Sequence, residues 1–263
     1  MGLTSNVTQH FRASERPFLH QASDWLVQAR TEYRPILTGF LNERERYLVQ
    51  TLVNREPDVH FAANGGYPEA EMQRGLLYPE YVTPAETDFE IGLVEIRYPV
   101  KFATLQHRQV LGALLGSGIE RNVIGDLITD GKRWQVITQL TMMEYLERTV
   151  TEMGRTKVQL LPQPLTERLP VHDDGQVVHV TLPSLRLDVV IATLFRMSRA
   201  GAKALVAHGK VRLNWFTYDQ PDYELAVHDL ISVRGFGRIK FDEQSGVSKK
   251  GKIKAAFDVI KNK

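Results

Sequence analysis

The chain of 263 residues contains no cysteine, which excludes disulfide bonds, thiolate metal sites and cysteine nucleophiles. It also lacks a long apolar run, although 43% of its residues are hydrophobic, so we expect no membrane insertion. Its first residues do not show the basic segment followed by an apolar segment that marks a secretory signal. These absences predict a cytoplasmic location.

Signatures of cofactor and metal chemistry are missing as well. The eight histidines show no ligand spacing such as H-E-x-x-H. The glycines of residues 111–121 do not follow G-x-G-x-x-G, and they close a predicted helix where that fingerprint would open one. The turn at Gly65-Gly66 lacks the lysine and the hydroxyl of a P-loop. We therefore expect no cofactor, no metal and no catalytic residue.

Charge is divided unevenly along the chain. Residues 182–263 carry 15 Lys and Arg against 8 Asp and Glu, whereas the remainder carries 18 against 23. The C-terminal part is therefore at +7 and the rest at −5. This division predicts that the C-terminal part binds a polyanion, while the acidic remainder is solvated or faces a protein partner. Lys249, Lys250, Lys252 and Lys254 are predicted to belong to a basic tail.

The C-terminal part shows a pattern of helices and strands with cations on one side. A helix is predicted to open at Ser198, whose hydroxyl can cap the first turn, and to end at Gly209. A strand follows, in which polar residues alternate with Val211 and Leu213, and a second strand over 230–234 runs into Gly235-Phe236-Gly237. We expect helix and strand to present one basic surface. The side chains predicted to contact RNA are Arg186, Ser198, Arg199, Lys203, Lys210, Arg212, Asn214, Arg234, Arg238 and Lys240.

These residues resemble the RNA-binding domain named after small-subunit ribosomal protein S-four. The segments that carry the resemblance are Arg186-Leu187-Asp188, Ser198-Arg199, Gly209-Lys210-Val211, Asn214 and Asp229-Leu230-Ile231. The chain departs from that family at His228, where a glycine is usual. The ending Ser232 to Arg238 is similar to the YlmH branch, as are Gly65-Gly66-Tyr67 and Gly125-Asp126 further upstream.

The resemblance to YlmH proteins implies a function and partners. It implies a non-catalytic protein that binds large-subunit rRNA and tRNA on ribosomal particles. It also implies a role in ribosome-associated quality control, in which the protein assists the addition of C-terminal tails to stalled nascent chains.

The remainder of the chain predicts an α+β protein in several parts. Residues 1–85 are predicted to be a mostly helical domain, because apolar residues recur at helical spacing from Phe18 and Asn42 with Glu45 forms a capping box. Residues 86–162 follow a β-α-β-β-α-β order, the ferredoxin-like plan shared with RNA-recognition motifs, with the second helix predicted from Thr141 to Met153. Trp134 of this region is as likely to belong to the core as to stack on a base. Prolines mark 163–180 as linker and strand, and 181–263 form the S-four-type domain.

Two other functions stay open from the sequence. An RNA-modifying enzyme is one, because S-four-type domains are often attached to pseudouridine synthases. The only Arg-Leu-Asp here lies in the RNA-binding helix itself, where Asp188 is better explained by the helix dipole and ion pairing. A scaffold is the other, which would link RNA to cell division through a protein partner of the N-terminal domains.

Overall fold

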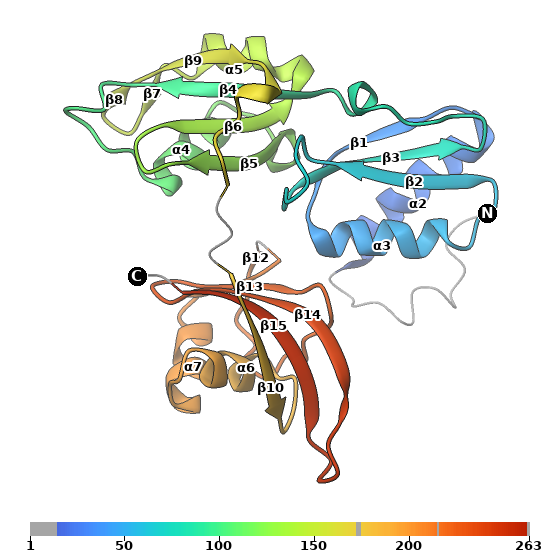
Figure 1. Cartoon of the computed structure of the whole chain (residues 1–263), viewed down its shortest axis with the longest axis vertical. Helices are drawn as coiled ribbons and strands as arrows, with labels where there is room; N and C mark the ends of the chain where they lie inside the picture. The colour runs from blue at the N-terminus through green and yellow to red at the C-terminus, as the bar shows by residue number, and fades with distance from the viewer. Residues whose placement is uncertain (1–14, 172–174, 215, 262–263) are drawn as a thin grey trace. The chain divides into compact units, whose positions relative to one another are not determined.

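The computed structural model describes residues 15–171, 175–214 and 216–261, and the chain divides into two compact units, residues 1–171 and 172–263. The first unit contains an N-terminal lobe, residues 15–82, and a middle lobe, residues 84–171 (Figure 1). The division between the units falls within the segment 163–180 that was predicted as linker and strand. Asp173 and Asp174 of that segment lie outside the described residues.

The N-terminal lobe packs two helices against a three-stranded antiparallel sheet. The helices are α2 (Arg16–Thr31) and α3 (Glu43–Val53), and the sheet has the order β1-β3-β2. Its strands are β1 (Ile36–Leu41), β2 (Val59–Asn64) and β3 (Gln73–Pro79). The predicted capping box is confirmed, since the Glu45 N–H donates to Asn42 Oδ1 at 3.0 Å and Glu45 Oε2 accepts from the Asn42 N–H at 2.8 Å.

The prediction that this region is mostly helical is wrong. Strand β3 lies in the centre of the sheet and is covered along nearly its whole length, so it lacks the alternation of buried and exposed residues that marks a half-buried strand. It also contains Gly75 and a buried arginine, Arg74, whose Nε donates to the Thr38 carbonyl at 2.9 Å. Both residues are unusual in a strand interior.

The middle lobe has the β-α-β-β-α-β element order. It comprises β4 (Ile91–Arg97), α4 (His107–Gly116), β5 (Ile124–Thr129), β6 (Trp134–Gln139), α5 (Met143–Thr149) and β9 (Gln159–Gln163). Its sheet has the order β5-β6-β4-β9, and every pair is antiparallel. Trp134 is 6% exposed and belongs to the core between the sheet and the two helices.

The end of the second helix in the middle lobe differs from the prediction. The sequence predicted a helix from Thr141 to Met153, whereas α5 ends at Thr149. Two short strands follow, β7 (Glu152–Met153) and β8 (Thr156–Lys157), joined by a turn at Gly154 with φ 67°. The β-branched residues Val150 and Thr151 disfavour continuation of the helix, because they lose side-chain freedom against the preceding turn.

The C-terminal unit places two helices on one face of a six-stranded antiparallel sheet (Figure 1). The helices are α6 (Leu187–Leu194) and α7 (Arg199–Ala207). The sheet order is β10-β15-β14-β13-β11-β12. Its strands are β10 (Gln176–Leu182), β11 (Val211–Leu213), β12 (Phe216–Thr217), β13 (Leu230–Val233), β14 (Gly237–Val247) and β15 (Ile253–Lys261).

The bend between β13 and β14 requires its glycines. Gly235 and Gly237 have φ of 85° and 137°, in the region that L side chains rarely adopt. A Cβ on Gly237 would lie 1.9 Å from the Ile260 carbonyl oxygen of β15. The bend between the strands is therefore tight, and the absence of a side chain at Gly237 allows β14 and β15 to lie close together.

Candidate nucleic-acid interface

Three of the predicted RNA-binding cations surround one buried carboxylate. Asp188, in the first turn of α6, has no exposed surface. Arg186 Nε lies 3.1 Å from Asp188 Oδ1, and Arg199 Nη2 of α7 lies 2.9 Å from Asp188 Oδ2. Lys203 Nζ, one helical turn after Arg199, lies 4.0 Å from the same oxygen. The Asp188 cluster, consisting of these four residues, therefore joins the beginnings of both helices.

The electrostatics of the cluster favour an ionised aspartate. Burial raises the pKa of Asp188, but the hydrogen bonds from Arg186 and Arg199 outweigh it and hold that pKa below its ordinary value. The cations remain accessible, since the side chains of Arg186, Arg199 and Lys203 are 35%, 55% and 50% exposed. With three cations against one carboxylate, the cluster presents positive charge to solvent from side chains whose geometry is fixed.

Ser198 holds the second helix in place next to this cluster. Its Oγ accepts a hydrogen bond from the Gly201 N–H at 3.0 Å, which is the cap that the sequence predicted. The helix ends as expected, with Gly209 at φ 64°. Ser198 thus fixes the start of α7, and with it the direction in which the side chains of Arg199 and Lys203 point.

The strand cations lie on the sheet face opposite the helices. Val211 and Leu213 are buried against α6 and α7, so Arg212 between them points away. Arg212 pairs in register with Ser232, and Ser232 with Arg238, which forms a row across β11, β13 and β14. The expectation that strand and helix present one basic surface is therefore wrong for Arg212 and Arg238, because alternation along a strand sends successive side chains to opposite faces.

Lys210, Arg234 and Lys240 complete the predicted cations. Lys210 and Arg234 are exposed neighbours at the ends of β11 and β13, where the Arg234 N–H donates to the Lys210 carbonyl at 2.9 Å. Lys240 lies on β14, with its Nζ 3.6 Å from Asp242 Oδ1. Lys210 and Arg234 thus lie next to each other at one end of the paired strands β11 and β13.

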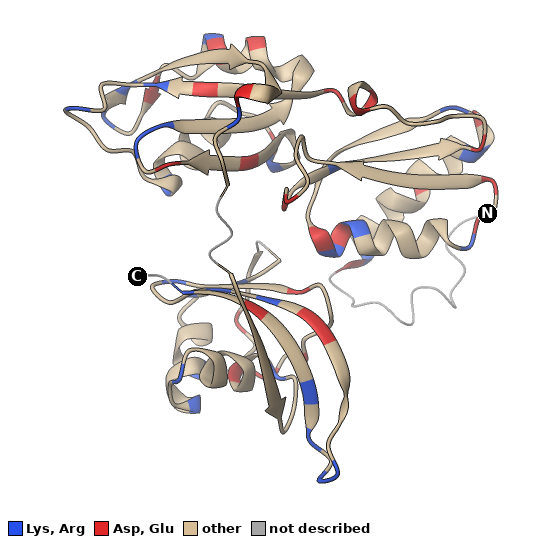
Figure 2. Ribbon diagram, in the orientation of Figure 1, with Lys and Arg blue, Asp and Glu red and all other residues tan. Residues whose placement is uncertain are grey.

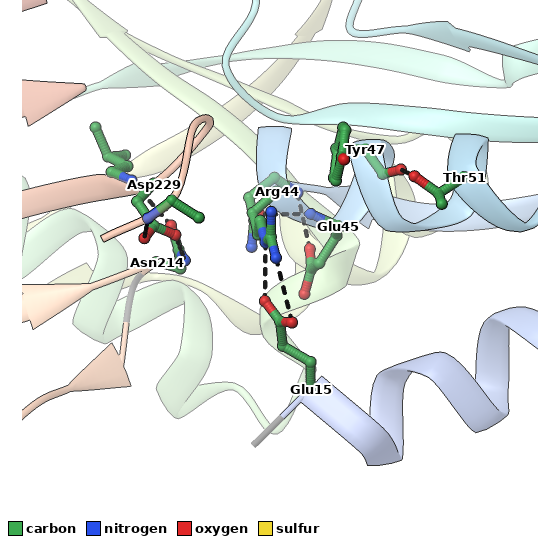
Figure 3. Close-up of polar contacts among 10 residues, drawn as sticks. Glu15, Arg44, Glu45, Tyr47, Thr51, Asn214 and Asp229 are labelled. Atoms are coloured by element: carbon green, nitrogen blue, oxygen red, sulfur yellow. Dashed lines mark hydrogen bonds and ion pairs between the residues drawn. The ribbon is translucent and has the colours of Figure 1, made fainter. Parts of the chain in front are cut away.

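Asn214 supports a turn of the backbone. It lies beyond the end of β11 with φ 47°, so it does not continue the alternating row that the sequence predicted. Its Nδ2 donates to Asp229 Oδ1 at 2.9 Å, and its Oδ1 accepts from the Leu230 N–H at 2.9 Å (Figure 3). Asp229 is buried and also accepts from the Ala226 N–H. The preceding residue, His228, takes φ 72° where the resembling family usually has glycine.

The lysines predicted as a basic tail form the tip of a hairpin. Strand β13 pairs with β14 only along 237–240, so the β14–β15 hairpin continues past it. At the tip, Gly251 has φ 76° and its N–H donates to the Ser248 carbonyl at 2.9 Å. Ser248 Oγ accepts from the Lys252 N–H at 3.0 Å. The hairpin lysines, exposed in this ordered turn and at the start of β15, are Lys249, Lys250, Lys252 and Lys254.

The face of the middle sheet that points away from α4 and α5 is covered by another segment of the chain. Gln135, at the centre of this face on β6, has no exposed surface. Its Nε2 donates to the Glu167 carbonyl at 3.0 Å and its Oε1 accepts from the Leu169 N–H at 2.7 Å. The covering segment, residues 164–169, thus closes this face of the sheet at Gln135.

The segment Gly65-Gly66-Tyr67 contacts the middle lobe. Asp126 of β5 accepts hydrogen bonds from the Tyr67 hydroxyl at 2.6 Å and from the N–H groups of Glu71 and Met72 at 2.8 and 3.2 Å. Burial raises the pKa of Tyr67, and the adjacent Asp126 raises it further. This segment is therefore a structural turn joining the two lobes, as the missing P-loop lysine suggested.

A second buried ion pair fixes the N-terminal lobe. Arg44 of α3 is 8% exposed, and its Nε and Nη2 lie 2.8 and 3.3 Å from the two carboxylate oxygens of Glu15 (Figure 3). The Arg44 guanidinium also lies over the Tyr47 ring, 5.2 Å from its centroid. This pair anchors the start of α2 to α3, and we assign it a structural role.

The described part of the chain contains neither a metal-binding cluster nor a membrane-spanning helix. No group of three or more His, Asp or Glu side chains within it is arranged to hold a metal ion. None of the helices described there is both long enough and apolar enough to cross a membrane.

The C-terminal unit contains an RNA-binding module of the S4 type, in which helices α6 and α7 are followed by the short strands β11 to β13 with exposed cations. Residues 185–231 match the "S4 domain". Residues 14–82 match the family described as "YlmH, N-terminal", and residues 84–167 match "Putative RNA-binding domain in YlmH".

Similar proteins extend this match over nearly the whole chain. A Bacillus subtilis (strain 168) protein named "Ribosome-associated protein quality control protein P2" is 37% identical over 254 residues, which are 97% of this chain and 98% of that protein. The solved structure "Cell division protein ylmH from Streptococcus pneumoniae" has a TM-score of 0.56 and 31% identity, and covers 61% of this chain and 98% of that chain. The chain belongs to the YlmH family.

Proposed function

We propose that this chain is a non-catalytic RNA-binding adaptor that associates with the large ribosomal subunit and tRNA. Its role would be in ribosome-associated quality control, where it assists the addition of C-terminal tails to stalled nascent chains in the cytoplasm. The name of the Bacillus subtilis relative supports the process, and the RNA-binding domain types support the kind of partner.

The Asp188 cluster is the observation that carries this proposal. Arg186 and Arg199 are held in position by hydrogen bonds to a buried carboxylate, with Lys203 nearby, and all three remain accessible. Such a preorganised array suits phosphate groups at fixed spacing, because little side-chain freedom is lost on binding. Lys210 and Arg234 add charge at the ends of β11 and β13, while Arg212, Arg238 and Lys240 offer a second contact on the sheet face opposite the helices. We expect shape and phosphate positions to be recognised more than base sequence.

The middle lobe is proposed to be a ferredoxin-like domain. Its element order and its strand order, β5-β6-β4-β9, support this class. We propose the division into residues 1–85, 86–162, 163–180 and 181–263 for the whole chain, with the N-terminal part built from helices and a sheet.

Sedimentation of the tagged full chain through a sucrose gradient tests the proposal. We expect co-migration with free large subunits carrying tRNA at low salt and release at high salt, because each phosphate contact adds to the salt dependence. The triple change Lys210→Gln, Arg212→Gln and Arg234→Gln should release the protein at lower salt. These side chains are exposed, and no ion pair involves them among the residues the structure describes.

A matched control removes the same charge from the N-terminal lobe. Arg16→Gln, Arg34→Gln and Arg55→Gln change exposed residues there and should leave co-migration as it is. If the unchanged chain stays at the top of the gradient at low salt, or if both triple variants behave alike, the proposal is wrong.

A scaffold that links RNA to cell division is the second candidate. The name of the Streptococcus pneumoniae structure, which contains the words cell division, favours it. It predicts that the full chain retains a protein partner after ribonuclease treatment, whereas the adaptor predicts that ribosomal proteins are lost together with the RNA.

A further inference from the structure

The middle lobe needs a surface other than its sheet if it is to contact RNA. Gln135 is buried beneath the covering segment, and Trp134 lies in the core. The base-stacking positions of an RNA-recognition motif are therefore closed. A different aromatic side chain in this lobe is open to solvent.

Phe102 is that side chain. It is 90% exposed, and it lies in the loop between β4 and α4 beside Val100, which is 50% exposed. The loop is ordered, because the Phe102 N–H donates to the Pro99 carbonyl at 2.9 Å and Leu105 is buried on its far side. The Tyr98 hydroxyl donates to the Lys132 carbonyl and ties the loop to the β5–β6 turn. A phenylalanine held in water by a structured loop leaves a large apolar face without a partner among the described residues.

Several segments meet at this end of the middle sheet, which we call the loop end: residues 97–109, 130–133 and 152–159 (Figure 1). Arg97 pairs in register with Gln159, and a Cβ on Gly154 would lie 2.9 Å from Gln109 Nε2 of α4. Together with the Tyr98 contact, these distances bring the three segments side by side.

Positive charge gathers at the loop end (Figure 2). Its segments contain seven Lys and Arg residues against two acidic residues, although residues 1–181 as a whole are acidic. One of the two, Asp130, accepts hydrogen bonds from the N–H groups of Lys132 and Arg133. Arg133 is paired with Glu95. The cations of the loop end are Arg97, Lys101, Arg108, Lys132, Arg133, Arg155 and Lys157.

We propose that the loop end is a second RNA-binding site, in which Phe102 stacks on an unpaired base while the surrounding cations hold the adjoining phosphates. An exposed aromatic ring amid positive charge is the arrangement that binds single-stranded nucleic acid, because every base offers a face for stacking. The cations make a nucleic acid the fitting occupant, since clustered lysines and arginines neutralise phosphates, whereas lysine is depleted from protein–protein interfaces. The inference rests on the proposed RNA-binding function and adds a contact separate from the C-terminal unit.

The test compares two RNA probes on the full chain. One is a single-stranded RNA of about 20 nucleotides and the other is a duplex of the same length, longer than the span that such sites usually occupy. Phe102→Ala should weaken binding of the single strand roughly tenfold and leave binding of the duplex unchanged, because stacking needs an unpaired base. Phe102→Trp should restore binding. Leu140→Ala, which removes a 53% exposed apolar side chain at the opposite end of the same sheet, should have no effect.

Three outcomes overturn the inference while the proposed function stands. Unchanged binding of the single strand by Phe102→Ala is the first, and equal weakening for both probes is the second. The third is loss of that variant from ribosomal particles with normal binding to both RNAs, which would assign the loop end to a protein partner. Failure of the unchanged chain to bind either probe or ribosomal particles contradicts the proposed function itself.

Discussion

Several single residues in the C-terminal unit have a strained backbone conformation or a buried side chain, and the sequence predicted this only in part. The sequence showed that position 228 has histidine where the resembling family usually has glycine. In the structure His228 has a φ of 72°, a conformation that costs an L residue about 1 kcal/mol. Asn214 looked like a surface strand residue, yet its amide is bound to Asp229 and Leu230. Sequence spacing could not reveal this, because the partners are 15 and 16 residues away.

The Asp188 cluster leads to a prediction on stability. Changing Arg186 and Arg199 together to glutamine should lower the free energy of unfolding, because it leaves a buried carboxylate without its main partners. Urea denaturation of the full chain measures this. Arg212→Gln with Arg234→Gln removes equal charge from exposed positions and should cost less than about 0.5 kcal/mol. Equal losses in the two double variants would contradict the structural role of the cluster.

The same cluster should make stability depend on pH in the acid range. The pKa of Asp188 is lower in the folded chain than its ordinary value, so the unfolded chain binds the proton first. The contribution of Asp188 is therefore complete above about pH 4 and is lost as the pH falls through the folded-state pKa. Asp188→Asn should remove this part of the acid dependence, and an unchanged slope of stability against pH below 4 would argue against it.

At the scale of elements, helices with a periodic apolar pattern and a recognisable cap could be predicted from the sequence. Strands at the centre of a sheet and very short strands could not. Helix α3 was announced by Asn42 with Glu45, and α7 by Ser198 and Gly209. Strand β3 was missed because it pairs on both sides and buries Arg74. The hairpin lysines were wrongly predicted to form a tail. The charge of Lys-Lys-Gly-Lys is obvious in the sequence, whereas the turn at Gly251 is not. The cations around Asp188 were predicted individually from the sequence. That they share one carboxylate could not be predicted, because it depends on the packing of α6 against α7.

The β14–β15 hairpin should contribute to RNA binding as one element. Changing all four hairpin lysines to glutamine should reduce the slope of log affinity for a ribosomal RNA fragment against log salt by about 3, if each lysine meets a phosphate. Filter binding over a range of salt concentrations measures that slope. The N-terminal variant with Arg16, Arg34 and Arg55 changed serves as the control. An unchanged slope in the hairpin variant would mean that the lysines remain solvated in the complex.

At the scale of the whole molecule, the two compact units should respond separately to disruption. Asp126→Ala removes three hydrogen bonds between the lobes of the first unit and should cost about 3 kcal/mol, whereas Tyr67→Phe, which removes one, should cost about 1 kcal/mol. Hydrogen exchange on the full chain should then show faster exchange in β2, β3 and β5 and unchanged exchange in residues 176–261. Equal acceleration in both units would contradict this separation.

The shared carboxylate at Asp188 also has a consequence for how relatives of this chain can diverge. A substitution of Asp188 leaves two arginines crowded together, and a substitution of either arginine weakens the neutralisation of a buried charge. Each single step is therefore disfavoured, while a joint change of all members is not. Positions 186, 188 and 199 should vary together across the family or not at all, even though only the arginines would touch RNA.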